Sequence, residues 1–207
     1  MKIFGDLVFI ERGRDMPMQL VSIGLARADG TDLYRINPES LSNVARHPWL
    51  SMHAAPHLPM HSPSQGILAW DEGHEEYEFV SMSLDDLIAD VLKFFADTPD
   101  PELWLHRGAY AHVVLHQLFG AMNEQPAAVP LFSRDLEELI IHNPAADLPP
   151  QPFRDHAMED ARWIRDAYWT LVVDDRRELL TKQSELTARL QTTEDAEVIE
   201  EHPGGEQ

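Results

Sequence analysis

The chain has 207 residues, a length that fits one domain with modest additions better than two full domains. Its formal net charge of −20 would repel a polyanion at long range, which excludes a protein that searches for nucleic acid with a basic surface. Cysteine is absent, so disulfides, thiolate nucleophiles and cysteine-ligated zinc or iron–sulfur sites are excluded. Any metal ion must therefore be held by carboxylates or histidines.

The apolar runs of the sequence bear on where the protein works. The chain begins with a single Lys and a short apolar run that Asp6 interrupts, so it lacks the long apolar core of a signal peptide. No stretch approaches the roughly 18 uninterrupted apolar residues that span a bilayer. We expect a cytoplasmic protein that makes no contact with a membrane.

Three apolar, β-branched runs near the N-terminus predict an antiparallel meander. The runs are LVFI, QLVSIGLA and DLYRI, and the turn-forming segments ERGRDMP and ADGT separate them. The next segment, NPESLSNVARHPW, predicts a short helix that begins near Pro38 or Ser40. Residues 48–66 are rich in Pro, His and Ser, and we expect them to form a loop.

Strands and helices alternate in the following part of the chain. Ser83 can cap a helix over SLDDLIADVLKFFAD, whose apolar side chains recur on one face. ELWLH then predicts a buried strand and GAYAHVVLHQLFG a helix ended by Gly120, and VPLFSRDLEELI repeats this pattern less clearly. A proline-rich connection leads into a long helix that begins near Asp155 and lies outside the sheet.

The C-terminal part of the chain is highly charged. From Val172 onward, Leu179, Leu186 and Leu190 recur at seven- and four-residue steps, which predicts a surface or partner-binding helix, and the last fifteen or so residues are typical of a disordered acidic tail. We therefore expect a domain over 1–171, a helical extension over 172–190 and a tail over 191–207.

Four segments of the sequence resemble one enzyme family. In chain order they are FGDLVFIERG, QLVSIGLARADGTDLYRI, ELWLHRGAYAHVVLHQLFG and FRDHAMEDAR, and together they cover roughly residues 2–168. They resemble the short bacterial and phage-type DEDDh 3'-5' exoribonucleases, relatives of oligoribonuclease and RNase T. The resemblance implies an α/β RNase H-like fold, with a mixed five-stranded sheet flanked by helices, and phosphodiester hydrolysis with Mg or Mn.

The resemblance also assigns site residues. It makes Asp6 and Asp160 metal ligands and His156 the general base, and residues four apart on a helix share a face, so we expect His156 and Asp160 to point into one site. Val8 and Ala111 stand where the family has a Glu and an Asp, so two of four metal carboxylates are missing. We expect Val8 and Ala111 to line the same pocket as apolar gaps.

These two losses decide the predicted activity. Two divalent cations roughly 3.5–4 Å apart need several converging carboxylates, so Asp6 and Asp160 alone should hold a metal weakly. Glu11 does not compensate, because its odd spacing from Asp6 points it to the other face of a regular strand, and Glu159 points away from Asp160 on a helix. We therefore predict an exoribonuclease-like protein with an impaired metal centre.

Three functions remain compatible with the sequence. The impaired protein would bind single-stranded RNA or nucleotide ends, or act through protein partners; the alternatives are an active Mg- or Mn-dependent 3'-5' exoribonuclease and a protein-interaction module without nucleic acid. A homodimer is compatible with each. Arg107 lies beside the mouth of the expected site, where it could contact phosphate, although an ordinary surface Arg is the more common case. His53, His57 and His61 recur every four residues, but the intervening prolines forbid the helix that would align them as ligands.

Overall fold

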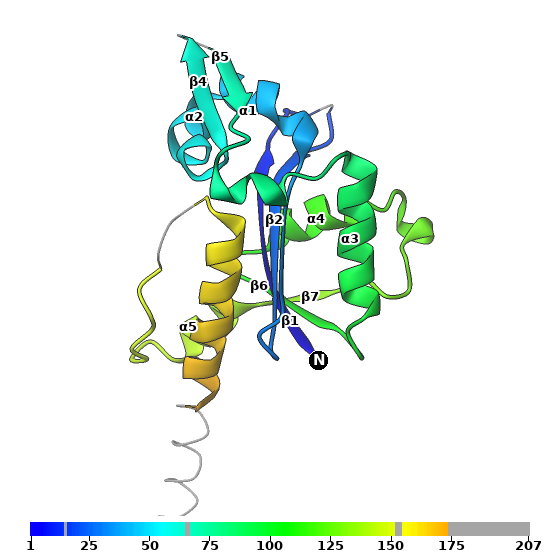
Figure 1. The fold of residues 1–207 in the computed structure, drawn as a ribbon. Coiled ribbons are helices and arrows are strands. Elements are labelled where there is room, and N and C mark those ends of the chain that lie inside the picture. The colour runs from blue at the N-terminus through cyan, green and yellow to red at the C-terminus, as the bar shows by residue number, and fades with distance from the viewer. Residues whose placement is uncertain (15, 65–66, 152–154, 174–207) are drawn as a thin grey trace, which may run out of the picture.

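A computed structural model describes residues 1–14, 16–64, 67–151 and 155–173. Its centre is a five-stranded sheet of order β3-β2-β1-β6-β7 (Figure 1). The first three strands form an antiparallel meander, whereas β6 pairs in parallel with β1 and β7 in parallel with β6. The predicted mixed five-stranded α/β architecture is thereby confirmed. The strands are β1 (Lys2–Ile10), β2 (Gln19–Arg27), β3 (Asp32–Ile36), β6 (Glu102–Leu105) and β7 (Ser133–Asp135).

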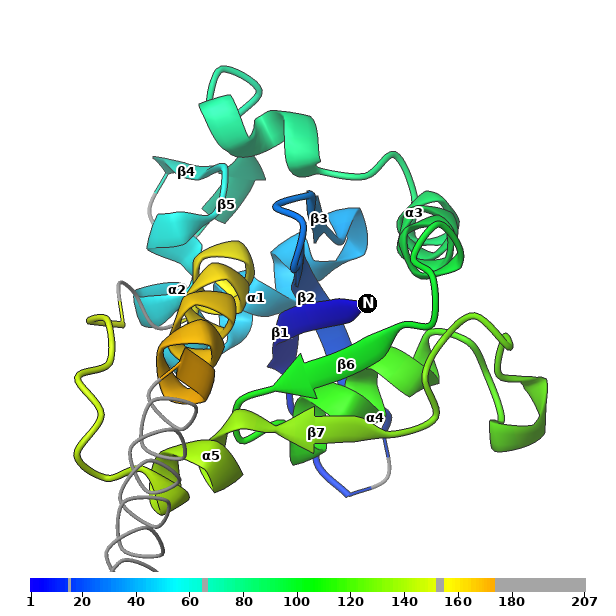
Figure 2. The same cartoon turned by 90° about the horizontal axis from the view of Figure 1, so that it is seen from below.

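Helices cover both faces of this sheet, as Figure 2 shows from below. One face packs against α3 and α4, and the other against α5 and a C-terminal helix described over 157–173. The labelled α-helices are α1 (Leu41–Arg46), α2 (Pro48–His53), α3 (Leu84–Ala96), α4 (Ala109–Gln117) and α5 (Leu136–His142). Short 3-10 helices cover Pro38–Ser40, Ala55–His57, Glu75–Phe79 and Met122–Glu124.

The expected loop over 48–66 is wrong. This region contains α2 and β4 (Met60–Ser64), which pairs with β5 (Ile67–Trp70) in a separate two-stranded sheet. Prolines are tolerated here because Pro48 and Pro56 occupy the first turns of their helices, where a missing N–H costs little. His53, His57 and His61 consequently belong to three different elements.

Alternation along β1 decides which side chains face the C-terminal helix. Ile3 and Leu7 belong to the core on the α3 and α4 side, whereas Phe4 and Val8 belong to cores on the opposite side. Asp6 lies between Phe4 and Val8 in this alternation, so β1 presents its carboxyl toward the C-terminal helix.

A glycine on β2 lets that helix approach the sheet. Gly24 pairs with Asp6 across the two strands, and a Cβ atom added to Gly24 would lie only 2.3 Å from the backbone oxygen of Ala157. The start of the C-terminal helix therefore rests directly on the backbone beside Asp6.

Two of the predictions from the sequence, the helical extension and the acidic tail, concern the chain beyond about residue 172. The described helix runs without a break across residues 171–173. The helical extension and the acidic tail fall almost wholly within 174–207, outside the described residues. Within the described part of the chain, each helix is too short or too polar to cross a membrane.

Candidate active site on the first strand and the C-terminal helix

A cavity of about 500 Å³ opens where β1 meets the C-terminal helix. Four residues with carboxyl groups line it: Asp6 from β1, Glu11 just after β1, Asp155 from the segment before the C-terminal helix, and Asp160 from the first turn of that helix. Its lining residues are Asp6, Leu7, Val8, Phe9, Glu11, His47, Trp49, Leu50, His106, Arg107, Gln151, Asp155, Asp160 and Ile164.

The carboxyl groups of this cavity are strongly coupled. Burial raises the pKa of Asp6 to about 7 from its ordinary value of 3.8, and the charges of Asp160 and then Asp155 add to the rise. Burial also raises the pKa of Asp160, although Gln151 Nε2 opposes this by donating a hydrogen bond of 2.7 Å to its Oδ1. Near neutral pH the cluster therefore tends to retain a proton, because a buried carboxylate beside other carboxylates is costly to ionise.

The two apolar replacements occupy different places. Val8 lines the cavity beside Asp6, as predicted, and is 5 % exposed. Ala111 does not line the cavity; it is buried in the core between the sheet and α3 and α4. The expectation that both residues line one pocket therefore holds for Val8 alone.

The structure does not bring His156 to the cavity. The helix begins at residue 157, and His156 caps it: its Nδ1 accepts a hydrogen bond of 3.3 Å from the backbone N–H of Glu159. Its Nε2 forms a 2.9 Å hydrogen bond with Glu76 Oε1, and its ring stacks on Tyr34 at 5.1 Å. The four-residue spacing from Asp160 failed as a guide because a capping residue does not project its side chain as an interior helical residue does.

Asp155 is the site residue that sequence reasoning missed. Its backbone adopts a left-handed conformation with φ +73°, which is uncommon for a residue other than glycine. The sequence signal is an acidic residue placed directly before the helix. Glu11 was also misjudged: it lines the cavity because β1 ends at Ile10, beyond which strand alternation no longer applies.

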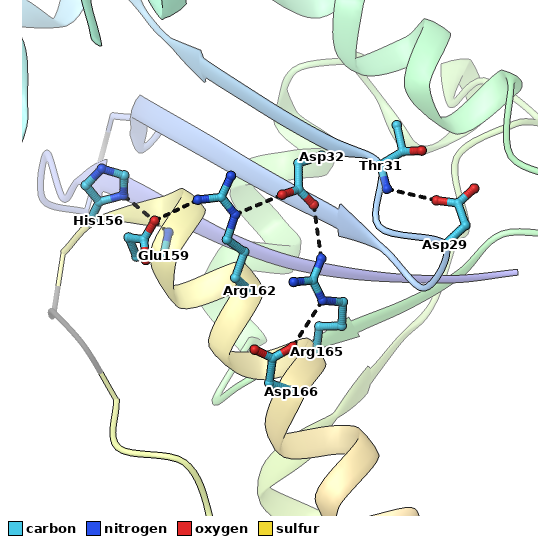
Figure 3. A network of polar contacts seen from close by, with 8 residues as sticks. All are labelled: Asp29, Thr31, Asp32, His156, Glu159, Arg162, Arg165 and Asp166. Carbon is cyan, nitrogen blue, oxygen red and sulfur yellow. Dashed lines mark hydrogen bonds and ion pairs between the residues drawn. The ribbon is translucent and has the colours of Figure 1, made fainter. Parts of the chain in front are cut away.

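A polar network holds the C-terminal helix against the meander (Figure 3). Asp32 of β3 accepts hydrogen bonds from Arg162 Nε at 2.8 Å and from Arg165 Nη1 at 3.2 Å. Arg162 also donates to Glu159 at 2.8 Å, so the first turn of the helix is fixed on its far side from the cavity. This network orients the helix without occupying the candidate site.

The remaining lining residues add nitrogen-bearing and aromatic side chains to the cavity. His47, His106 and Arg107 line it together with Trp49, a residue that is 55 % exposed and whose ring stacks on His53 with 3.9 Å between ring centres. The cavity therefore combines carboxyl groups, two imidazole rings, a guanidinium group and an indole ring. Over the described residues, the acidic and histidine side chains form no group of three close enough to share a metal ion.

Known proteins identify the family. No family model matches the chain. Two curated proteins do: 3'-5' exoribonuclease Rv2179c of Mycobacterium tuberculosis strain H37Rv and 3'-5' exoribonuclease MT2234.1 of strain CDC 1551. Each is 32 % identical over 163 residues, which cover 78 % of this chain and 88 % of the relative. With this similarity and the mixed five-stranded sheet, the chain belongs to the 3'-5' exoribonuclease family.

Proposed function

We propose that the chain is a DEDDh-type relative that binds the 3' end of single-stranded RNA in this cavity and hydrolyses it slowly or not at all. The observation that carries the proposal is Val8, an isopropyl group that lines the cavity beside Asp6 where the resembling family places a carboxylate. A second carboxylate is missing at Ala111, whose methyl group is buried in an apolar core.

The residues present do not fit a centre for two Mg or Mn ions. Two such ions need carboxylates that converge from several elements, and neither Val8 nor Ala111 can supply a ligand atom. Asp6 and Asp160 remain in the cavity, two ligands where the resembling family has four. His156 pairs with Glu76 in a separate cavity, so it is not placed to take a proton from a water molecule at Asp6.

The same cavity has features that suit a nucleotide. The exposed ring of Trp49 offers a face on which an unstacked base can lie, and base stacking on aromatic rings is a common way to bind single-stranded RNA. Asp6, Gln151 and Asp160 offer polar groups that can meet ribose hydroxyls. Because the chain is strongly acidic, we expect recognition of a short end rather than of a long polyanion.

One observation favours an active enzyme as the second candidate. Asp155 adds a further carboxyl group to the cavity, and its charge reaches both Asp6 and Asp160. A carboxylate at this position could partly compensate for those missing at Val8 and Ala111. This candidate differs from the first in a measurable way, because it requires turnover that depends on a divalent cation.

Parallel binding and turnover measurements test the proposal. A short fluorescent single-stranded RNA with a free 3' hydroxyl is titrated with the protein, and release of nucleoside monophosphates is followed with Mg²⁺ or Mn²⁺. The relative Rv2179c serves as the reference exoribonuclease. We expect binding, with turnover at least about 100-fold below the reference, since each lost element of such a site typically costs about 10²–10³-fold. Turnover equal to that of the reference would support the active alternative, and absence of binding with or without metal would reject both.

A further inference from the structure

One wall of the cavity carries an arginine in an unusual backbone conformation. The backbone of Arg107 has φ +51°, a left-handed value that residues other than glycine seldom adopt. The Asp135 carboxylate stabilises this turn by accepting hydrogen bonds from the backbone N–H of Arg107 at 2.9 Å and of Gly108 at 3.1 Å. A Cβ atom on Gly108 would lie 2.2 Å from Leu105 Cβ, so the turn requires glycine there. Hydrogen bonds from the turn to Asp135 and the glycine at position 108 hold this turn, and it places Arg107 in the cavity lining.

Glu137 positions the side chains of Arg107 and His106 in this wall. One of its oxygens accepts a 2.9 Å hydrogen bond from Arg107 Nη2, and the other forms a 2.9 Å hydrogen bond with His106 Nε2. Among contacts with the described residues, the remaining guanidinium nitrogens of Arg107 have no partner, and its side chain is 71 % exposed. A planar fork of free N–H groups matches the oxygens of a phosphate.

The position of this arginine in the chain is informative. Arg107 lies four residues before Ala111, in the segment where the resembling family supplies a carboxylate for a metal ion. Ala111 supplies no such carboxylate, and the cavity that holds Asp6 and Asp160 is lined by Arg107, His106 and His47. A fixed cationic side chain can provide the positive charge that a phosphate otherwise receives from a bound metal.

We infer that Arg107, supported by His106 and His47, forms a phosphate subsite that holds the terminal phosphodiester of bound RNA without a divalent cation. The inference rests on the proposed function, since it places the 3'-terminal nucleotide in this cavity. It goes further by naming the group that the cavity recognises and the residue that recognises it. Glu137 and Asp135 act as positioning residues for Arg107.

The full-length protein and a short 3'-hydroxyl oligoribonucleotide in EDTA at low salt test the inference by fluorescence anisotropy. Arg107→Gly is the main variant, because glycine accepts the left-handed backbone while the side chain and its guanidinium group are removed. We expect at least a 10-fold weaker affinity and a shallower dependence of log affinity on log salt, by about 0.7 for one phosphate contact with a single strand. Arg107→Lys keeps the positive charge but loses the planar fork of N–H groups, so its RNA affinity should lie between those of the parent and Arg107→Gly.

Arg134→Ala is the matched control. Arg134 is 65 % exposed and paired with Glu102, much as Arg107 is paired with Glu137, but it does not line the cavity. Its removal should change RNA affinity less than twofold. Circular dichroism and thermal melting of each variant show whether the fold is retained.

The outcomes separate this inference from the proposed function. If the parent binds RNA in EDTA and Arg107→Gly binds equally well, the phosphate subsite is overturned while RNA binding stands. If the parent binds only after Mg²⁺ or Mn²⁺ is added, the subsite is again overturned, because the metal supplies the charge. If the parent binds RNA in neither condition, the proposed function fails as well. Equal losses in Arg107→Gly and Arg134→Ala would reduce the effect to general surface charge and overturn the subsite.

Discussion

Asp155 and His156 are adjacent in the chain, yet their side chains enter separate cavities. Asp155 joins Asp6 and Asp160 in the candidate active site, whereas His156 meets Glu76 and Tyr34 in a cavity bounded by β3 and the segment before α3. The left-handed backbone at Asp155 and the capping role of His156 produce this divergence. The group best placed in the candidate site to exchange a proton near neutral pH is therefore the Asp6 carboxyl, whose pKa is about 7.

The ionisation of Asp6 should make stability depend on pH. Its folded-state pKa of about 7 lies above its ordinary value of 3.8, so the folded protein binds this proton more tightly than the unfolded chain. Its contribution to stability is present at low pH and is lost as pH rises through about 7. We expect Asp6→Asn to stabilise the protein at pH 8 relative to the parent, by at most about 4 kcal/mol, and to have little effect near pH 4. Urea unfolding across this range measures the difference.

Asp147→Asn controls for the loss of one negative charge. Asp147 is exposed and does not line the cavity. This change should leave the pH dependence of unfolding parallel to that of the parent. Parallel curves for Asp6→Asn and the parent would contradict the raised pKa of Asp6.

The ion pair of His156 and Glu76 should also make stability fall as pH rises, as Asp6 does, but this pair stabilises the fold and lies outside the candidate site. Burial lowers the pKa of His156, yet the hydrogen bond and charge of Glu76 outweigh burial and leave it above the ordinary value of 6.5. The stability from this pair is present below about pH 6.5 and is lost as pH rises through the folded-state pKa. Glu76→Gln should lower the free energy of unfolding by about 1–3 kcal/mol at pH 5.5 and by less at pH 8.5. RNA affinity should stay within twofold, because the pair lies outside the active-site cavity.

Gly24 should be required for the site as well as for the fold. A Cβ at Gly24 would meet the backbone of Ala157, so Gly24→Ala must displace the start of the C-terminal helix and with it Asp155 and Asp160. We expect a loss of about 1–3 kcal/mol in unfolding free energy, the usual cost of overpacking, and at least a 10-fold weaker affinity for RNA. Gly73→Ala is the control, since its added Cβ would come no closer than 3.4 Å to another atom. Equal behaviour of the two variants would contradict the close approach.

The predictable parts of the fold were those governed by local rules. Ser83 was expected to begin a helix, and its hydroxyl accepts from the Asp86 backbone N–H at 3.1 Å, so α3 starts there. Alternation along the first strand likewise placed Asp6 and Val8 on one face. The helix expected to end at Gly120 stops at Gln117, three residues before that glycine takes its left-handed conformation.

The unpredictable parts depended on geometry at element ends. Sequence spacing does not show where the side chain of a residue just before a helix points. The sequence therefore could not predict that Asp155 enters the candidate site and that His156 enters a separate cavity. The burial of Ala111 depends on how α4 rotates against β1, which spacing alone does not determine. Residues 48–66 were misread because their prolines occupy helix starts, where they are compatible with helix.

Rebuilding the metal centre is the most direct test of why activity should be weak. Val8→Glu places a carboxylate in the cavity beside Asp6, so this change alone should tighten binding of Mn²⁺, measured by calorimetry. Ala111→Asp alone should destabilise the protein by about 1–3 kcal/mol, because it buries a carboxyl in an apolar core. Val8→Glu combined with Asp155→His, which supplies an imidazole inside the cavity, should raise metal-dependent degradation of a short RNA at least about 100-fold over the parent.

The comparison between two histidine positions makes the rebuilding experiment decisive. In the rebuilt protein, His156→Ala should leave most of the gained activity, because its ring lies in another cavity and is held by Glu76. Reverting position 155 to Asp should remove most of it, because only that position places a base beside Asp6 and Asp160. The opposite result, in which His156→Ala silences the rebuilt protein and reversion at 155 does not, would mean that His156 swings into the cavity when RNA binds. If the rebuilt protein gains metal affinity but no turnover, the cavity has diverged beyond its ligands, and RNA binding through Arg107 becomes its main activity.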